Sequence, residues 1–290
     1  MALPVRLVLW RHMSLLDPTL QRSAHQRAQG ELRVSLVRRG AATVLRDLRQ
    51  QGCMKARFPR PTGWMETITL NTSGGVAGGD RLSTTLDIGP RAQASFAAQA
   101  AERFYRALPD DPPAHIRTSI TLAEGAAAEW LPQDSILFNH CALDRELDID
   151  LAPDASFLGL ESIVFGRAAM GETIADARLR DTIRIRRAGR LILHDAIRLD
   201  GPAAILAAKS AANANRAIAT LVYVAPDAAA RLDALRAAWE NIQVETGASA
   251  WNGMLIARII APDAATLRAT IVRGLPALRD GRPLPRVWLC

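Results

Sequence analysis

The feature that most constrains this chain is a long series of short segments with the periodicity of β-strands. Up to about residue 200, several segments alternate apolar and polar residues, most clearly residues 82–88 and 147–151. Turn signals such as Gly89-Pro90 and Pro153-Asp154 separate the segments at short intervals. Because no helical segments lie between the strands, the pattern predicts a mainly β, antiparallel architecture. The candidate strands are residues 32–37, 65–70, 82–88, 92–98, 116–122, 127–131, 147–151, 157–165, 182–186, 191–199, 218–224 and 255–260.

The last third of the chain contains two segments with helical periodicity. The first has apolar residues at Leu232, Leu235 and Trp239, and the second, residues 264–278, repeats the pattern. Each follows a strand-like segment and the sequence Ala-Pro-Asp-Ala, whose proline and aspartate are typical of a helix N-terminus. We therefore expect two α-helices near the C-terminus, in an α/β layer at about residues 203–282 that closes one end of the β body. Residues 26–290 are interpreted as a single domain, and residues 1–25 are assigned no role.

The composition is that of a globular protein in a reducing compartment. The chain has 290 residues, 49% of them hydrophobic and 22% charged, which is sufficient for a core without disulfides or structural metals. The three cysteines, Cys53, Cys141 and Cys290, are far apart and form no Cys-x-x-Cys pair. No signal-peptide pattern and no apolar segment of membrane-spanning length is present. We expect a cytoplasmic protein that does not interact with membranes.

The net charge of +7 raises the question of nucleic-acid binding. The densest group of arginines, between Arg178 and Arg190, includes Asp181 and fits the polar face of strands better than a nucleic-acid-binding tail. Aromatic residues make up only 5% of the chain, too few for a series of base-stacking platforms. A basic nucleic-acid-binding protein is therefore a minor alternative, and a basic surface facing an acidic protein partner is compatible with the charge.

A glycine-rich stretch, Leu70–Leu82, has the composition of a phosphate-binding loop. Gly74 and Gly79 have the Walker A spacing, but Asp80 occupies the position of the lysine, where a carboxylate would repel phosphate. A strand-like segment follows the loop, instead of a helix whose N-terminus could bind an anion. We interpret the stretch as a connection between two strands. Asp80 either satisfies local backbone amides or presents a carboxylate to a cavity.

Six short segments form an ordered series along the chain: Asn71–Asp80 (NTSGGVAGGD), Gln99–Arg106 (QAAERFYR), Trp130–Phe138 (WLPQDSILF), Gly166–Glu172 (GRAAMGE), Arg187–Asp195 (RAGRLILHD) and Pro285–Trp288 (PRVW). In this order they resemble the motifs of the UreD (UreH) family of urease accessory proteins, and the resemblance extends from about residue 28 to the C-terminus. Two departures from the family pattern occur: Asp134 stands where glutamate is usual, and Asn139-His140 stands where the family has Asp-Gly.

The resemblance implies a specific role and fold. UreD proteins are not enzymes; they bind urease apoprotein and, with UreF and the GTPase UreG, deliver nickel to the urease active site. Their fold is a large helicoid of β-strands with two helices. By resemblance we expect no tightly bound cofactor and only transient nickel(II), and a dimer within the accessory complex is left open.

A delivery protein must release its metal, so sparse oxygen ligands suit it better than a cysteine–histidine cage. Each candidate also has a structural interpretation, such as a Glu172–Arg167 surface ion pair. His140 and Cys141 form a weaker candidate pair, because neighbouring residues on a strand point to opposite faces. The candidates for metal transfer are Asp80, Glu102, Asp134, Glu161 and Glu172, beside a structural loop of Gly74, Gly75, Gly78 and Gly79.

A hydrolytic enzyme of unknown substrate is the alternative from another class. Ser73, with His140 or His194 and an aspartate, supplies the residue types of a catalytic triad. However, the chain has no Gly-x-Ser-x-Gly elbow, and Ser73 is not in the strand–turn–helix context that exposes a nucleophile.

Overall fold

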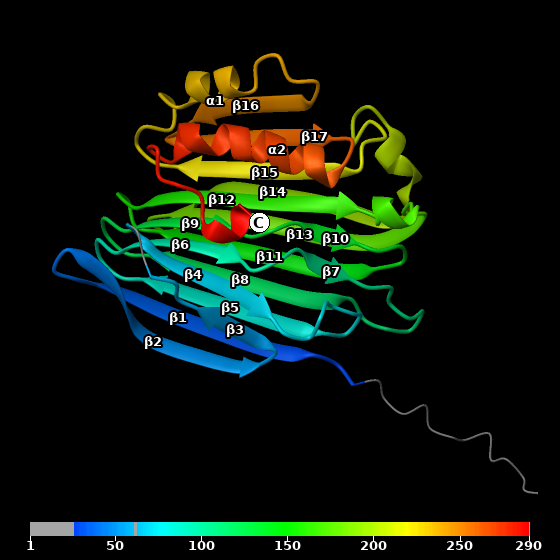
Figure 1. Cartoon of the computed structure of the whole chain (residues 1–290), viewed down its shortest axis with the longest axis horizontal. Helices are drawn as coiled ribbons and strands as arrows, with labels where there is room; N and C mark the ends of the chain where they lie inside the picture. The colour runs from blue at the N-terminus through cyan, green and yellow to red at the C-terminus, as the bar shows by residue number, and fades with distance from the viewer. Residues whose placement is uncertain (1–25, 61–62, 290) are drawn as a thin grey trace, which may run out of the picture.

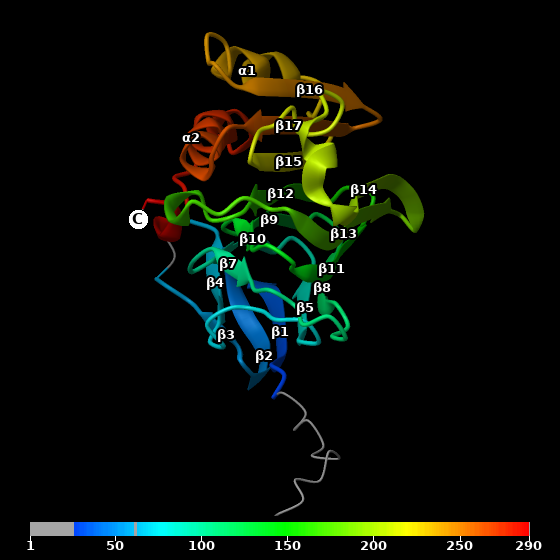
Figure 2. The ribbon, with the colours of Figure 1, turned by 90° about the vertical axis from the view of Figure 1, so that its right-hand side faces the viewer.

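The computed structural model describes residues 26–60 and 63–289. Within these residues the strands form two sheets that face each other, and the two α-helices lie on the outer side of one sheet (Figures 1 and 2). Residues 1–25, to which the sequence assigned no role, lie outside the described residues. A mainly β fold with two α-helices near the C-terminus is confirmed.

The seven-stranded sheet has the order β14-β13-β11-β8-β5-β1-β2. Its strands are β1 (Gln29–Arg39), β2 (Ala42–Gly52), β5 (Arg81–Ile88), β8 (Ala114–Leu122), β11 (Ala142–Leu151), β13 (Asp176–Arg187) and β14 (Arg190–Pro202).

The ten-stranded sheet has the main order β16-β17-β15-β12-β9-β6-β4-β3, and the short strands β7 and β10 extend beside β12. Its strands are β3 (Met54–Arg57), β4 (Met65–Asn71), β6 (Gln93–Ala98), β7 (Glu102–Phe104), β9 (Ala127–Leu131), β10 (Ser135–Leu137), β12 (Ser156–Phe165), β15 (Ala217–Val224), β16 (Glu245–Trp251) and β17 (Met254–Ala261). The α-helices are α1 (Leu232–Ala238) and α2 (Ala264–Gly274), and the 3₁₀ helices are η1 (Ala168–Met170), η2 (Ala203–Ala207), η3 (Leu275–Leu278) and η4 (Arg286–Trp288).

Pairing in the body of the fold is parallel, which corrects the antiparallel expectation for the centre of both sheets. Neighbours β5, β8, β11 and β13 pair in parallel, as do β4, β6, β9 and β12. Consecutive long strands alternate between the sheets, so a strand in the opposite sheet acts as the crossover that a helix makes in other parallel folds. Antiparallel pairs occur at the ends, in β1–β2, β3–β4 and β13–β14, and in the pairings of β15 with β12 and β17.

The two sheets differ in how many of their faces are buried. The seven-stranded sheet buries one face, and β5 accordingly alternates Leu82, Thr84, Leu86 and Ile88 inward with exposed or half-buried residues. The ten-stranded sheet buries both faces at its centre, where nine of the ten residues of β12 are buried, whereas its edge strand β16 has no buried residue. One hydrophobic core fills the space between the sheets, and a second lies between the ten-stranded sheet and α1, α2 and η4.

The sequence predicted that the aspartate of each Ala-Pro-Asp-Ala sequence lies at the N-terminus of an α-helix, and this prediction is confirmed for α2 but not for α1. Asp263 caps α2, because its carboxylate accepts a hydrogen bond of 2.7 Å from the Thr266 amide. The corresponding Asp227 caps no helix; it accepts hydrogen bonds from the Tyr223 hydroxyl (2.9 Å) and from Arg231 (2.7 Å).

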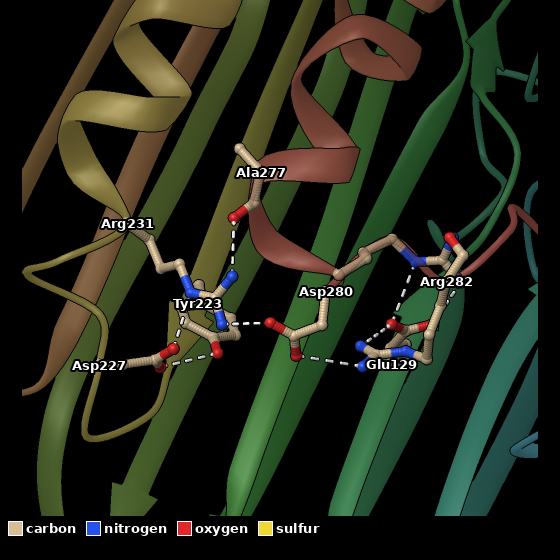
Figure 3. A network of polar contacts seen from close by, with 8 residues as sticks. Glu129, Tyr223, Asp227, Arg231, Ala277, Asp280 and Arg282 are labelled. Carbon is tan, nitrogen blue, oxygen red and sulfur yellow. Dashed lines mark hydrogen bonds and ion pairs between the residues drawn. The ribbon is translucent and has the colours of Figure 1, made fainter.

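A polar network fastens this layer to the sheet. Figure 3 shows Arg231 bridging Asp227, Asp280 and the Ala277 carbonyl, while Arg282 reaches Glu129 on β9. Arg279, at the end of η3, makes two further hydrogen bonds to Glu129, of 2.9 and 3.0 Å. The layer is therefore tied to the centre of the ten-stranded sheet by a buried carboxylate.

Candidate functional site

The glycine loop connects β4 of one sheet to β5 of the other and packs against residues 103–112. Gly75 has a φ of 142°, and a β-carbon there would lie 2.4 Å from the Tyr105 ring. The Tyr105 hydroxyl donates a hydrogen bond of 2.7 Å to the Gly74 carbonyl. Val76 and Phe104 form a parallel bridge at the same place. The loop is a connection between strands, as predicted, and glycine is required for its close contact with Tyr105.

Asp80 is buried at the end of the loop and holds backbone in place. Its carboxylate accepts hydrogen bonds from the amides of Ala28 (2.7 Å) and Ala77 (2.8 Å). These contacts tie the loop to the residue that precedes β1. The structure therefore places Asp80 in the local backbone role; its role in metal transfer stays a prediction.

A cavity of about 220 Å³ lies between the sheets beside the loop. Its lining runs from exposed residues, including Gly74 and Arg103, to the buried Arg145 and Glu161. Of the five carboxylates predicted from the sequence, the cavity brings together Glu102 and Glu161.

Glu102, on β7, is the half-buried acid of the cavity. Asn71, at the start of the glycine motif, donates a hydrogen bond of 3.1 Å from its side-chain amide to Glu102. Burial raises the pKa of Glu102 above its usual value, and this hydrogen bond only partly offsets the effect. Asn71 thus positions a carboxylate that lies 31 residues away in the sequence.

Glu161 is the deeply buried acid, and it belongs to a larger group. Its carboxylate accepts a hydrogen bond from the Trp130 indole (2.9 Å) and forms an ion pair with Arg145 (2.7 Å). Arg145 also binds both oxygens of Asp181, at 2.8 and 2.7 Å, and donates to the Ser135 hydroxyl at 2.7 Å. Burial raises the pKa of Glu161, and the charge of Asp181 adds to this effect, while the ion pair with Arg145 offsets it only in part.

The Arg145 group lies at the inner end of the cavity. A second, apolar space of about 10 Å³ is lined by Ile183, Ile185 and Val222 on its far side. Glu161 and Leu147 line both spaces. The side chain of Glu161 therefore forms part of the wall that separates them.

Asp134 and Glu172 are held outside the cavity. Asp134 accepts a hydrogen bond of 2.8 Å from the Ser162 hydroxyl, and burial raises its pKa. Glu172 forms an ion pair of 2.8 Å with Arg167, whose hydrogen bond lowers the pKa of the carboxyl. These contacts match the structural interpretation given for Glu172; metal roles for both residues stay predictions.

The segment that departs from the family pattern forms a tight turn. His140 is exposed and has a φ of 61°, the conformation for which a glycine is the usual residue. The Asn139 side-chain oxygen accepts hydrogen bonds from the amides of Ala175 (2.9 Å) and Asp176 (3.1 Å). An aspartate would accept the same bonds, so the missing carboxylate has a structural replacement here.

Cys141 follows this turn and is buried, and burial raises the pKa of its thiol to about 12. Within residues 26–60 and 63–289, no three His, Cys, Asp or Glu side chains form a group that could hold a metal.

The geometry gives little support to the two alternative functions, a hydrolytic enzyme and a nucleic-acid-binding protein. The Ser73 hydroxyl is held by the Asn71 side chain (2.6 Å) and the Gly75 carbonyl (2.8 Å), which are local partners and supply no base. In the densest group of arginines, Arg184 pairs with Glu146 (2.8 Å) and Asp148 (2.6 Å) on the outer face of the seven-stranded sheet. Such pairing neutralises charge that a nucleic-acid backbone would need.

Asp181 points inward, whereas the arginines that surround it in the sequence point outward. The prediction that Asp181 lies on the same polar face as these arginines is therefore wrong. Together with Arg145, Asp181 is the functional candidate that sequence reasoning missed. A signal existed: Arg145 and Asp181 occupy inward positions in alternating strands, between apolar neighbours such as Leu143 and Leu147 or Leu179 and Ile183. A charge on the apolar face of a strand requires a buried partner.

No helix in the described ranges is long and apolar enough to cross a membrane.

Comparison with known proteins gives consistent matches along almost the whole chain. The family model described as UreD urease accessory protein matches residues 28–289. Urease accessory protein UreD of Xanthobacter autotrophicus strain Py2 is 45% identical over 277 residues, covering 94% of this chain and 95% of that protein. Proteins of the same name from Azorhizobium caulinodans (44% identical, covering 91% of this chain and 97% of that protein) and from a Methylobacterium species (43%, covering 93% and 98%) match similarly.

Proposed function

The chain belongs to the UreD family of urease accessory proteins and has a role in urease maturation, and from this premise we propose that it is a non-catalytic scaffold for nickel delivery. It binds urease apoprotein and the UreF–UreG complex, and nickel(II) in transit passes through the cavity between the two sheets. The observation that carries the proposal is the pair of carboxylates, Glu102 and Glu161, in one cavity of about 220 Å³.

The chemistry of the cavity suits a cation that must leave again. Nickel(II) accepts carboxylate oxygens, and its selectivity depends on geometry more than on raw affinity. Glu102 offers an acid near the exposed part of the lining, and Glu161 offers one at the buried end. The two lie at different depths, so each gives a weak contact and neither completes a coordination shell.

Replacing these acids with glutamine tests the passage of nickel. We expect Glu102→Gln and Glu161→Gln, and more strongly the double variant, to lower the nickel content and activity of urease after activation with UreF, UreG, GTP and nickel(II). Glu124→Gln is the matched control, because it removes an exposed carboxylate that does not line the cavity. Pull-down of urease and of UreG by each variant separates lost transfer from lost assembly.

Two results would contradict the proposal. Full activation of urease by the folded double variant would remove the cavity from the nickel route. Failure of the unsubstituted chain to co-purify with urease and with UreF–UreG would remove the scaffold role, whatever the effect of the glutamine variants.

A further inference from the structure

Arg145 places a fixed positive charge at the buried end of the cavity, where a passing cation would meet it. We propose that its guanidinium is a tethered counter-ion that prevents Glu161 and Asp181 from retaining a divalent cation. The inference rests on the proposed passage of nickel through the cavity and adds a residue that determines how tightly the cavity holds its cargo.

The guanidinium of Arg145 is surrounded by the oxygen atoms of three side chains. Its side chain is 9% exposed, and it meets Glu161 at 2.7 Å and Asp181 at 2.7 and 2.8 Å. The Ser135 hydroxyl is a third oxygen partner, at 2.7 Å. Oxygen atoms from three side chains thus surround one positive group, and oxygen is a ligand that nickel(II) also accepts.

Electrostatics explains why the guanidinium matters. Two carboxylates buried together without a cation repel each other and lack solvation, so an incoming divalent ion would be held tightly. An arginine side chain stays charged in proteins, and its contacts with Asp181 and Glu161 hold this charge between the two carboxylates. A divalent ion must then displace the guanidinium or approach it against repulsion, and either requirement weakens retention.

The position of Arg145 relates its ion pairs to the proposed passage of nickel. Arg145 lines the larger cavity, and Glu161 separates that cavity from the apolar space beyond it. A cation that bound tightly at this wall would block the cavity. Because Arg145 pairs with Glu161 and Asp181, it favours release of the cation over its retention.

The test is nickel binding by the purified full chain, measured by equilibrium dialysis without urease. We expect Arg145→Gln to bind nickel(II) at least about tenfold more tightly than the unsubstituted chain, because the metal no longer competes with a buried guanidinium. Arg145→Lys keeps the positive charge and should show no such gain. Adding Glu161→Gln to Arg145→Gln should abolish the gain, which identifies the acid that holds the metal.

Arg184→Gln is the matched control. Arg184 also pairs with two acids across β11 and β13, Glu146 and Asp148, but on the outer face of the sheet, where its side chain is 26% exposed. The same substitution there should leave nickel affinity unchanged. An equal gain in Arg184→Gln would overturn the inference, because it would show a general effect of charge.

Loss of Arg145 leaves two buried acids uncompensated, so the variant could fail to fold without metal. In that case nickel(II) in the refolding buffer should restore folding and raise the melting temperature, since a ligand that binds only the folded state stabilises it. An Arg145→Gln chain that folds without gaining affinity, or that does not fold even with nickel(II), overturns the inference. Because these measurements omit urease, their failure leaves the proposed passage of nickel to be decided by the activation assay.

Discussion

Replacing Arg279 with methionine tests whether the C-terminal layer is fastened by its buried ion pair. Glu129 is 1% exposed and Arg279 3% exposed, and two hydrogen bonds of 2.9 and 3.0 Å join them. Removing one partner of a buried pair costs about 3–5 kcal/mol, because it leaves an uncompensated charge. Arg282 still reaches Glu129 at 2.7 Å and offsets part of this cost, so we expect a loss of about 3 kcal/mol, at the lower end of that range.

Thermal unfolding measures the effect. For a chain of this size about 1 kcal/mol corresponds to about 2 °C, so the melting temperature should fall by about 6 °C. Arg198→Met is the control, because Arg198 and Asp200 are 78% and 62% exposed and such a pair contributes less than about 1 kcal/mol. Adding Glu129→Gln to Arg279→Met should recover part of the loss, since it removes the stranded charge. Equal melting temperatures for Arg279→Met and Arg198→Met would refute the reasoning.

Acid titration gives an independent check of the same pair. Burial raises the pKa of Glu129, but the hydrogen bonds and charges of Arg279 and Arg282 outweigh that effect and lower it below its usual value. Stability from such a group is present above the unfolded pKa of about 4.3 and is lost as pH falls through the folded pKa. Arg279→Met should therefore show a shallower loss of stability below about pH 5 than the unsubstituted chain.

Two further predictions concern the glycine loop and the thiols. Gly75→Ala should lower the free energy of unfolding by about 1–3 kcal/mol in urea, because its β-carbon would meet the Tyr105 ring. Gly74→Ala, whose β-carbon meets nothing within 4 Å, should cost about 1 kcal/mol from its positive φ alone, and equal losses would contradict the role given to Tyr105. In a Cys290→Ser background, iodoacetamide at pH 8 should label Cys53 in the native chain. Cys141, whose buried thiol has a pKa of about 12, should be labelled only after unfolding, and equal native labelling would contradict its burial.

Local patterns predicted most of the elements but not their pairing, and they missed the strands β2, β3, β7, β10 and β16. Alternation identified β5 and β11, and the second Ala-Pro-Asp-Ala sequence located the start of α2, whereas α1 begins four residues after the first such sequence. The parallel direction of the central strands was not predictable in the same way. Period-2 alternation reports which face is buried, but it does not say whether the next strand lies beside the first or in the opposite sheet.

The candidate site, like the fold, could be predicted only in part from the sequence. The sequence selected Glu102 and Glu161 as candidates, and the fold places both in one cavity although they are 59 positions apart. It also selected Asp80, whose carboxylate is used by two backbone amides. A motif identifies the residues of a family, but only the three-dimensional arrangement separates an acid that lines a cavity from one that holds a loop.

The alternation of consecutive strands between the two sheets limits how such a chain can change in length. Two neighbouring central strands of one sheet are separated in the sequence by at least one strand of the other sheet. Ala142 on β11, for example, pairs with Arg178 on β13 after the chain has formed β12 in the opposite sheet. Deleting a single central strand would move every later strand to the wrong sheet and turn its inward side chains outward. Viable insertions and deletions in the body should therefore come as pairs of strands or be confined to the connecting loops, so length variation among relatives should fall at the turns and at the two ends.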